Sequence, residues 1–282
     1  MNNRVLRLKF MAIGFPALAG FTVFYLLPFI RALGYSFRAD SFSRRFVFLE
    51  NYINVLGNGY YQLALKNTFL FSVISVVCLT ALSLLLSLGL ARMGKRFRFI
   101  RDFLVAPMIL PTASVVFAWQ TLFRTGLYDE TARLMAASGG EFLTILPLYL
   151  LYLWKHAGLS IILISAAIAG LQPELLEAAA MDGAKGGRMF RSVILPMITP
   201  ALLFVVVLSF VNALKNFRES YLYFWTGYPP DAAYTVQYYM NNHFYKLNYP
   251  NLATGSVIFT GIIVMILLVM YRLENRFNAQ IY

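Results

Sequence analysis

Residues 177–200, which read EAAAMDGAKGGRMFRSVILPMITP, decide the fold of this 282-residue chain. They are rich in small residues, carry charges of both signs and lie between two long apolar runs. Pro173 and Glu174 suit the first turn of a helix. The backbone amides there have no partner within the helix, so a proline loses nothing, and the positive end of the helix dipole favours an acidic side chain. Asp182-Gly183 is a turn signal, since glycine accepts backbone angles that other residues resist. The stretch predicts a short amphipathic helix, a tight turn and a second short helix that carries Lys185, Arg188 and Arg191.

This stretch resembles the EAA loop found in permease subunits of binding-protein-dependent ABC importers. The resemblance rests on Glu177, Ala178, Ala179, Asp182, Gly183, Ala184, Phe190, Leu195 and Pro196. It implies that these residues form a coupling helix, which docks in a cleft of an ATP-hydrolysing subunit and transmits the closure of that subunit. The chain departs from the family at Gly187, where a bulky aromatic residue is usual. A helix lying among lipid headgroups would explain the amphipathic pattern but not the joined D-G-A and L-P.

The composition is that of a chain that lives in lipid. It is 60% hydrophobic and only 13% charged, whereas soluble domains carry roughly 25% charged residues. The net charge of +12 does not require nucleic acid, because the basic residues cluster at the ends of apolar runs, where they anchor headgroups. The single Cys78 lies inside an apolar run and indicates neither a disulfide nor a metal site.

Six apolar runs are long enough to span a membrane, since a spanning helix needs about 20 residues. They cover residues 10–30, 67–91, 103–123, 142–173, 192–214 and 247–271. Ala17-Leu18-Ala19 imitates a signal-peptide cleavage site, but apolar character continues to Ile30, so we expect an uncleaved first span. Pro107 and Pro111 suggest a kink in the third span.

The expected fold is therefore an all-α integral membrane protein with six transmembrane helices and a helix-turn-helix coupling loop, which the resemblance identifies as the fold of type I ABC importer permeases. We expect residues 1–66 to form the first helix and an outer loop. Residues 67–282 would form the permease core, with the coupling loop at residues 171–200. The polar and aromatic residues 241–251 would form an exterior loop that touches a binding protein or is only solvated.

Basic residues predict the orientation, because cytoplasmic loops are enriched in Lys and Arg. They are dense at the N-terminus, after the second run, in the coupling loop and at the C-terminus: Arg4, Arg7, Lys9, Arg92, Lys95, Arg96, Arg98, Arg101, Lys185, Arg188, Arg191, Arg272 and Arg276. Both termini and the coupling loop are expected in the cytoplasm of a bacterial or archaeal cell, with the chain in its inner membrane.

Nothing in the sequence predicts an enzyme. Residues 89–95 match G-x4-G-K, but a phosphate-binding loop follows a strand and carries Ser or Thr next, where this chain has Arg96. We expect no catalytic residue, no metal and no cofactor on this chain. ATP and Mg²⁺ would be bound by a separate ATPase chain.

The first polar group inside a span is Lys155-His156. An ionisable residue at membrane depth usually faces a bundle interior or an aqueous cavity. The neighbouring Tyr152, Trp154 and Gly158 resemble a W-K-x-x-G-like stretch that lines the substrate cavity in sugar-importing relatives. We expect Tyr152, Lys155 and His156 in such a cavity. The alternative is that Lys155 extends to an interface and Trp154 joins an aromatic belt.

A second polar group follows the fifth run: Asn212, Lys215, Asn216, Arg218 and Glu219. Its i, i+4 spacing would place the two asparagines on one helix face and permit a Lys215–Glu219 salt bridge. The residues after it resemble a family stretch ending in T-G-G-G-P, with Tyr228 and Pro229 replacing two glycines. The group lines the substrate pathway or caps the span at the outer interface. Trp119 and Gln120 are a third candidate, although a glutamine can equally bridge helices.

The resemblance implies a permease that passes a sugar or oligosaccharide into the cytoplasm by alternating access. Its partners would be a second similar permease, two ATP-binding subunits, an extracytoplasmic binding protein and lipid, without nucleic acid. The basic groups near the expected cavity leave open an anionic solute, such as a glycerol phosphate or an acidic oligosaccharide. A secondary transporter would use buried acids or histidines to couple ions, and the predicted spans contain no buried Asp or Glu.

Overall fold

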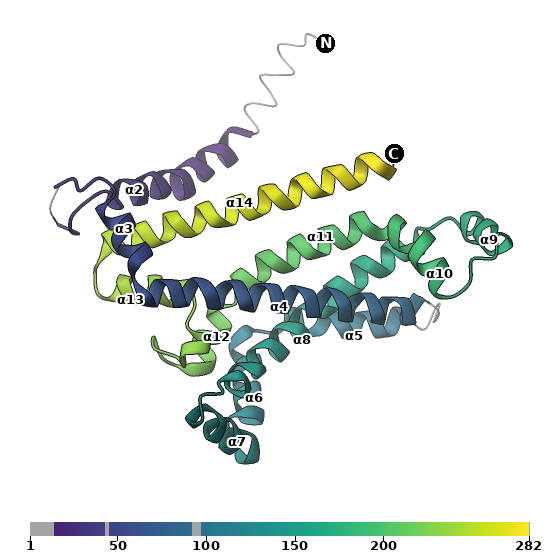
Figure 1. Cartoon of the computed structure of the whole chain (residues 1–282), viewed down its shortest axis with the longest axis horizontal. Helices are drawn as coiled ribbons and strands as arrows, with labels where there is room; N and C mark the ends of the chain where they lie inside the picture. The colour runs from purple at the N-terminus through teal and green to yellow at the C-terminus, as the bar shows by residue number, and fades with distance from the viewer. Residues whose placement is uncertain (1–13, 43–44, 92–96, 282) are drawn as a thin grey trace, which may run out of the picture. The chain divides into compact units, whose positions relative to one another are not determined.

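The structure, a computed structural model, describes residues 14–42, 45–91 and 97–281 (Figure 1). Part of the predicted orientation rests on residues outside these ranges: Arg4, Arg7, Lys9, Arg92, Lys95 and Arg96. The first four residues of the predicted first span, 10–13, also lie outside them. The described residues are almost entirely helical, and their only extended pairing is an isolated bridge between Arg38 and Phe46. The predicted all-α fold is confirmed.

The helices follow one another closely along the chain. They are α2 (Leu27–Tyr35), α3 (Glu50–Gly57), α4 (Gly59–Leu90), α5 (Phe97–Ile109), α6 (Thr112–Phe123), α7 (Gly126–Ala137), α8 (Phe142–Ala169), α9 (Pro173–Met181), α10 (Gly187–Met189), α11 (Leu195–Leu214), α12 (Phe217–Phe224), α13 (Val236–Tyr245) and α14 (Tyr249–Ile281). The π-helical turns η1 (Thr22–Leu26) and η3 (Phe190–Ile194) and the 3₁₀ turn η4 (Asp231–Ala233) complete them.

Five helical runs of the described residues are long and apolar enough to cross a membrane: Gly14–Tyr35, Gly59–Leu90, Phe142–Ala169, Gly187–Phe224 and Tyr249–Arg272. A sixth exists if Phe103–Ile109 and Thr112–Phe123 count as one broken span. The second span begins earlier than predicted, because the Asn58 side chain accepts hydrogen bonds from the amides of Tyr60 and Tyr61 and caps α4.

The third predicted span, residues 103–123, is not one kinked helix. Its two halves meet at an angle of 105°. Pro111 lies at the break with an extended backbone (ψ 128°) and cannot donate a hydrogen bond to the preceding turn. Proline also disfavours helical geometry in the residue before it, here Leu110. The break makes Thr112 the first residue of a new helix.

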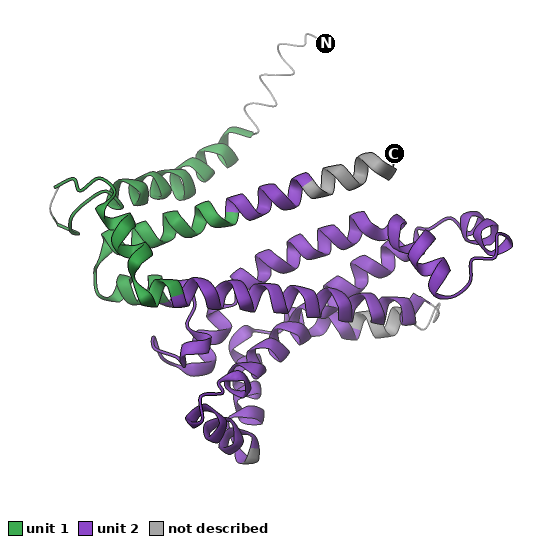
Figure 2. Ribbon diagram, viewed as in Figure 1, with its two compact units in different colours: residues 1–62, 239–263 green, residues 63–238, 264–282 purple. Residues whose placement is uncertain are grey.

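The structure divides into two compact units, coloured in Figure 2. Unit 1 comprises residues 1–62 and 239–263, and unit 2 comprises residues 63–238 and 264–282. The predicted boundary at residue 66 separates a first helix and outer loop from a permease core, which is not a division into compact units, so it stays a prediction. In unit 2, α8 packs against α5, α7 and α11, and its buried side chains Tyr152, Ala157 and Ile161 share an apolar cluster with Leu79 and Ala213.

The predicted exterior loop at residues 241–251 is mostly helical. Helix α13 continues to Tyr245, and α14 starts at Tyr249. Leu247 makes the turn between them with a positive φ of 53°. The side chain of Asn248 then accepts a hydrogen bond from the amide of Asn251, which caps the first turn of α14.

His243, on α13 and outside the candidate spans, predicts a pH dependence of stability. Burial, and then the charge of Lys246, lowers the pKa of His243. The unfolded chain takes up a proton near pH 6.5, whereas the folded chain resists it, so stability is complete above about pH 6.5 and falls as the pH drops toward the lowered value. The midpoint temperature of thermal unfolding in detergent should fall less between about pH 7.5 and about pH 5.5 for His243→Asn than for the natural chain. Equal losses in both would contradict this.

Candidate functional site

Helix α9 holds the core of the EAA-like motif. The residues that follow it, Asp182-Gly183-Ala184, explain why the helix ends where it does. Gly183 adopts a φ of +83°, which a residue with a Cβ resists. This lets the amide of Ala184 donate to the carbonyl of Ala179 at 2.9 Å and the amide of Gly183 donate to Ala180 at 3.1 Å. These two bonds are a Schellman motif, which satisfies the last carbonyls of a helix. The D-G-A letters therefore end α9 abruptly at Met181.

Helix α9 has no buried residue. Glu177 is exposed, and the apolar Leu175 and Met181 are 44% and 89% exposed. A short helix that presents both apolar and acidic side chains to its surroundings is typical of a surface that a partner covers.

The predicted second short helix of the coupling loop is not separate. Arg188 and Arg191 lie on a helical run that begins at Gly187 and continues through η3 into α11, while Lys185 precedes it. Pro196 has no amide hydrogen to donate. The backbone hydrogen bonding of the helix continues just before it through a π-turn, in which the amide of Leu195 donates to the carbonyl of Phe190. Phe190, Leu195 and Pro196 thus belong to the helical run that carries the fifth span.

Unit 2 contains a polar cavity of about 290 Å³, called the central cavity here. It is lined by Lys155, His156, Asn212, Lys215, Asn216, Arg218 and Glu219. The two polar groups that the sequence singled out therefore meet at one place, although more than 50 residues separate them along the chain. Lys155 and His156 come from the middle of α8, and the others from the end of α11, the turn after it and the beginning of α12.

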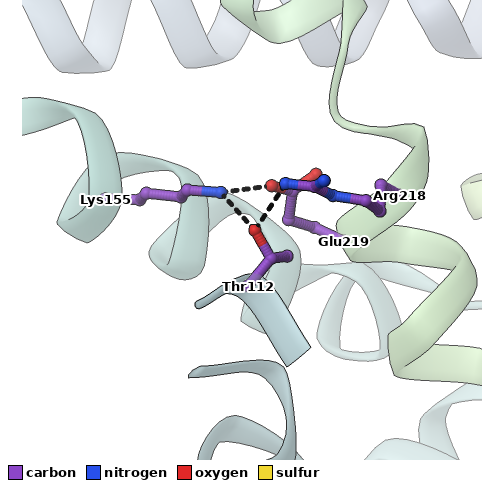
Figure 3. A network of polar contacts seen from close by, with 4 residues as sticks. All are labelled: Thr112, Lys155, Arg218 and Glu219. Atoms are coloured by element: carbon purple, nitrogen blue, oxygen red, sulfur yellow. Dashed lines mark hydrogen bonds and ion pairs between the residues drawn. The ribbon is translucent and has the colours of Figure 1, made fainter. Parts of the chain in front are cut away.

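An ion pair joins Lys155 on α8 to Glu219 on α12 (Figure 3). The side chains of both residues are nearly buried, with 12% and 10% exposed. The Thr112 hydroxyl, at the start of α6, accepts a hydrogen bond from the Lys155 ammonium at 3.1 Å and one from the Arg218 guanidinium at 2.8 Å. Lys155 therefore reaches across from α8 to α12 and to the start of α6.

The predicted Lys215–Glu219 pair is wrong. The helix ends at Leu214, Lys215 and Asn216 form a turn, and α12 starts at Phe217. The i, i+4 rule assumes an unbroken helix, so neither this pair nor the shared face of the two asparagines follows from it. The candidate span Gly187–Phe224 of the structure extends beyond the predicted run 192–214 and so includes Glu219, which is buried.

Three predicted pathway residues do not line the central cavity. The Tyr152 hydroxyl donates to the carbonyl of Ser209 at 2.6 Å, and the side chain is 1% exposed. The Trp119 indole donates to Pro147 at 2.8 Å and stacks on Trp154. The Gln120 amide donates to the carbonyls of Leu222 at 3.0 Å and Tyr223 at 2.8 Å. Each of these side chains connects two helices. For Gln120 this is the alternative role, a bridge between helices, that the sequence also allowed.

Thr112 is the residue that sequence reasoning missed. The available signal was its position directly after Pro111, where a helix that restarts exposes a hydroxyl near its first turn. Among the described residues, no group of three or more His, Cys, Asp or Glu is arranged to hold a metal.

Comparison with known proteins identifies similar chains. The model of the family described as "Binding-protein-dependent transport system inner membrane component" matches residues 80–280. The sn-glycerol-3-phosphate transport system permease protein UgpA of Agrobacterium fabrum is 28% identical, covering 90% of each chain. The trehalose/maltose transport system permease protein MalF of Thermococcus litoralis is 26% identical, covering 98% of this chain and 99% of the relative.

A solved structure shares the fold. It is a chain of a bacterial ABC transporter involved in the import of the acidic polysaccharide alginate, with a TM-score of 0.75 and 22% identity. The superposition covers 97% of this chain and 96% of that chain.

Proposed function

Because the chain belongs to the family of binding-protein-dependent transport system inner membrane components, we propose that it forms part of the path by which a sugar-type solute crosses the inner membrane. The predicted family is confirmed, and the chain is a multi-pass transport subunit. The named relatives carry glycerol 3-phosphate and trehalose or maltose, and a third, from Halalkalibacterium halodurans, carries arabinooligosaccharides. These names support a small polyhydroxylated solute.

The observation that supports the proposal is that one helix, α8, leads from the polar cavity to the unburied helix α9. Lys155 precedes the end of α8 at Ala169 by 14 residues, which a helix spans in about 21 Å. Helix α9 begins at Pro173, four residues after α8 ends. A displacement of α9 by a partner would therefore be passed along α8 to the central cavity.

The proposed mechanism is alternating access. An ATP-binding subunit, which also holds Mg²⁺, would receive α9 and move it on closing. The cavity would then open toward the solute delivered by an extracytoplasmic binding protein and return toward the cytoplasm after hydrolysis. A second, similar permease and a second ATP-binding subunit would complete the assembly. Both termini and α9 would lie on the cytoplasmic side.

A pull-down with matched glycine variants tests the docking role of α9. Gly183→Val places a β-branched residue at φ +83°, and Gly139→Val does the same at φ +89° after α7, away from α9. Neither added Cβ meets an atom within 4 Å, so both variants carry a similar backbone strain. We expect Gly183→Val to reduce recovery of the ATP-binding subunit from detergent extract about tenfold, and Gly139→Val to leave recovery unchanged.

Mass spectrometry of the recovered chains measures this outcome. Equal recovery of the ATP-binding subunit with both variants would show that α9 is not the docking helix. Recovery of this chain alone, still able to transport in liposomes without ATP, would overturn the importer proposal and favour a secondary transporter.

A further inference from the structure

The central cavity holds more positive than negative charge. Lys155, Lys215 and Arg218 are cationic, and Glu219 is the one carboxylate among the lining residues. The cavity therefore has a surplus of two positive charges, with His156 taken as neutral. Charge of this kind is costly inside a membrane protein, because the low dielectric weakens its solvation and strengthens like-charge repulsion.

The ion pair assigns the surplus to particular residues. Glu219 compensates Lys155, with which it is nearly buried. Arg218 donates to the Thr112 hydroxyl, which is a neutral acceptor and does not compensate its charge. The Lys215 side chain makes no hydrogen bond or ion pair with any described residue, and Lys215 is exposed on the cavity wall. The uncompensated cations are thus Lys215 and Arg218.

A helix dipole adds to this charge. Thr112 is the first residue of the 12-residue helix α6, and no side chain caps that end. The positive end of the dipole lies at the residue that contacts both Lys155 and Arg218. The α6 end therefore raises the positive potential beside the cavity.

From this charge arrangement we infer that the solute carries an anionic oxygen group, a phosphate or a carboxylate, on a hydroxyl-bearing skeleton. Lys215 and Arg218 bind the anionic group, and a guanidinium suits it because its planar donors match the two oxygens. Asn212 and Asn216, on the same wall, offer amide donors and acceptors to hydroxyls. A neutral sugar would leave the charges of both cations uncompensated. This inference rests on the proposed function and specifies its solute.

Paired probes separate charge from skeleton. The importer, purified through this chain with its partner subunits, is titrated with sn-glycerol 3-phosphate against glycerol and with glucuronate against glucose. We expect each anion to bind at least about tenfold more tightly than its uncharged counterpart. Added salt should weaken only the anions, because it screens their attraction to exposed cations. The preferred anion distinguishes a phosphate from a carboxylate solute.

Variants test the assigned residues. Lys215→Gln and Arg218→Gln should each weaken binding of the preferred anion about fivefold, with little change for the uncharged probe. Lys215→Gln removes no side-chain hydrogen bond or ion pair among the described residues, so the fold of the variant should be preserved. Arg133→Gln removes one exposed cation on α7, whose partner Asp129 is also on α7, and should leave anion binding unchanged.

Two results would overturn the inference: uncharged probes that bind as tightly as their anionic counterparts, or a Lys215→Gln variant with unchanged anion affinity. Both results are measured on an importer that has assembled with its partner subunits. Failure of the ATP-binding subunit to accompany the chain would instead contradict the proposed function, so the two failures are distinguishable.

Discussion

Gly158→Ala is expected to force α5 away from α8 and to destabilise the folded chain by about 3 kcal/mol. A Cβ at Gly158 would lie 1.9 Å from the carbonyl oxygen of Leu104 and 2.5 Å from its carbonyl carbon. Both atoms are backbone, so no side-chain rotation relieves the overlap. The two helices must separate, and the apolar contacts between them are lost along with the shift.

The measurement is thermal or denaturant unfolding in detergent, together with the yield of monodisperse protein. Gly261→Ala is the matched control, because Gly261 lies in the candidate span Tyr249–Arg272 and an added Cβ there meets nothing within 4 Å. The control should be neutral or slightly stabilising, since alanine favours helix over glycine. An unfolding midpoint for Gly158→Ala equal to that of the control would contradict the close approach of α5 to α8.

Gly158→Ala should also impair transport. Gly158 follows His156 by two residues on α8, so a displaced helix moves one wall of the central cavity. A variant that still folds is therefore expected to transport poorly even where the coupling helix remains intact.

Lys155→Met is expected to cost about 3 kcal/mol of stability, because it leaves Glu219 buried without its ionic partner. The double variant Lys155→Met/Glu219→Leu should recover most of this loss, since an apolar pair of similar volume needs no compensation. A double-mutant cycle completed with Glu219→Leu isolates the coupling between the two side chains. Full stability of the single Lys155→Met variant would contradict a buried ion pair.

The exposed pair on α7 provides the comparison. Arg133 and Asp129 are 2.7 Å apart, but the Arg133 side chain is 77% exposed. Arg133→Met should cost less than about 1 kcal/mol, because an ion pair at the surface contributes little and water solvates the Asp129 carboxylate that remains. The contrast between the two pairs measures the effect of burial on charges of the same type.

Much of the fold was determined by the sequence alone. Apolar runs of sufficient length mark the spans, because a membrane leaves the backbone few alternatives to a helix. Pro173 and Gly183 mark the two ends of α9 through backbone geometry that is local to each residue. The residues of the central cavity were also identified from the sequence: Lys155 and His156 interrupt an apolar run, where an ionisable side chain usually faces a cavity, and the others lie at the end of a run or directly after it.

Only the tertiary structure decided which charges meet. Local spacing favoured Lys215 as the partner of Glu219, but a turn at Lys215 interrupts the helix, and the partner is Lys155, 64 residues away. Spacing rules hold along one unbroken helix, whereas contacts between distant helices depend on how those helices pack. The same reason explains why Tyr152 and Gln120 join helices instead of lining the cavity, and why Thr112 reaches the ion pair only through the 105° break before it.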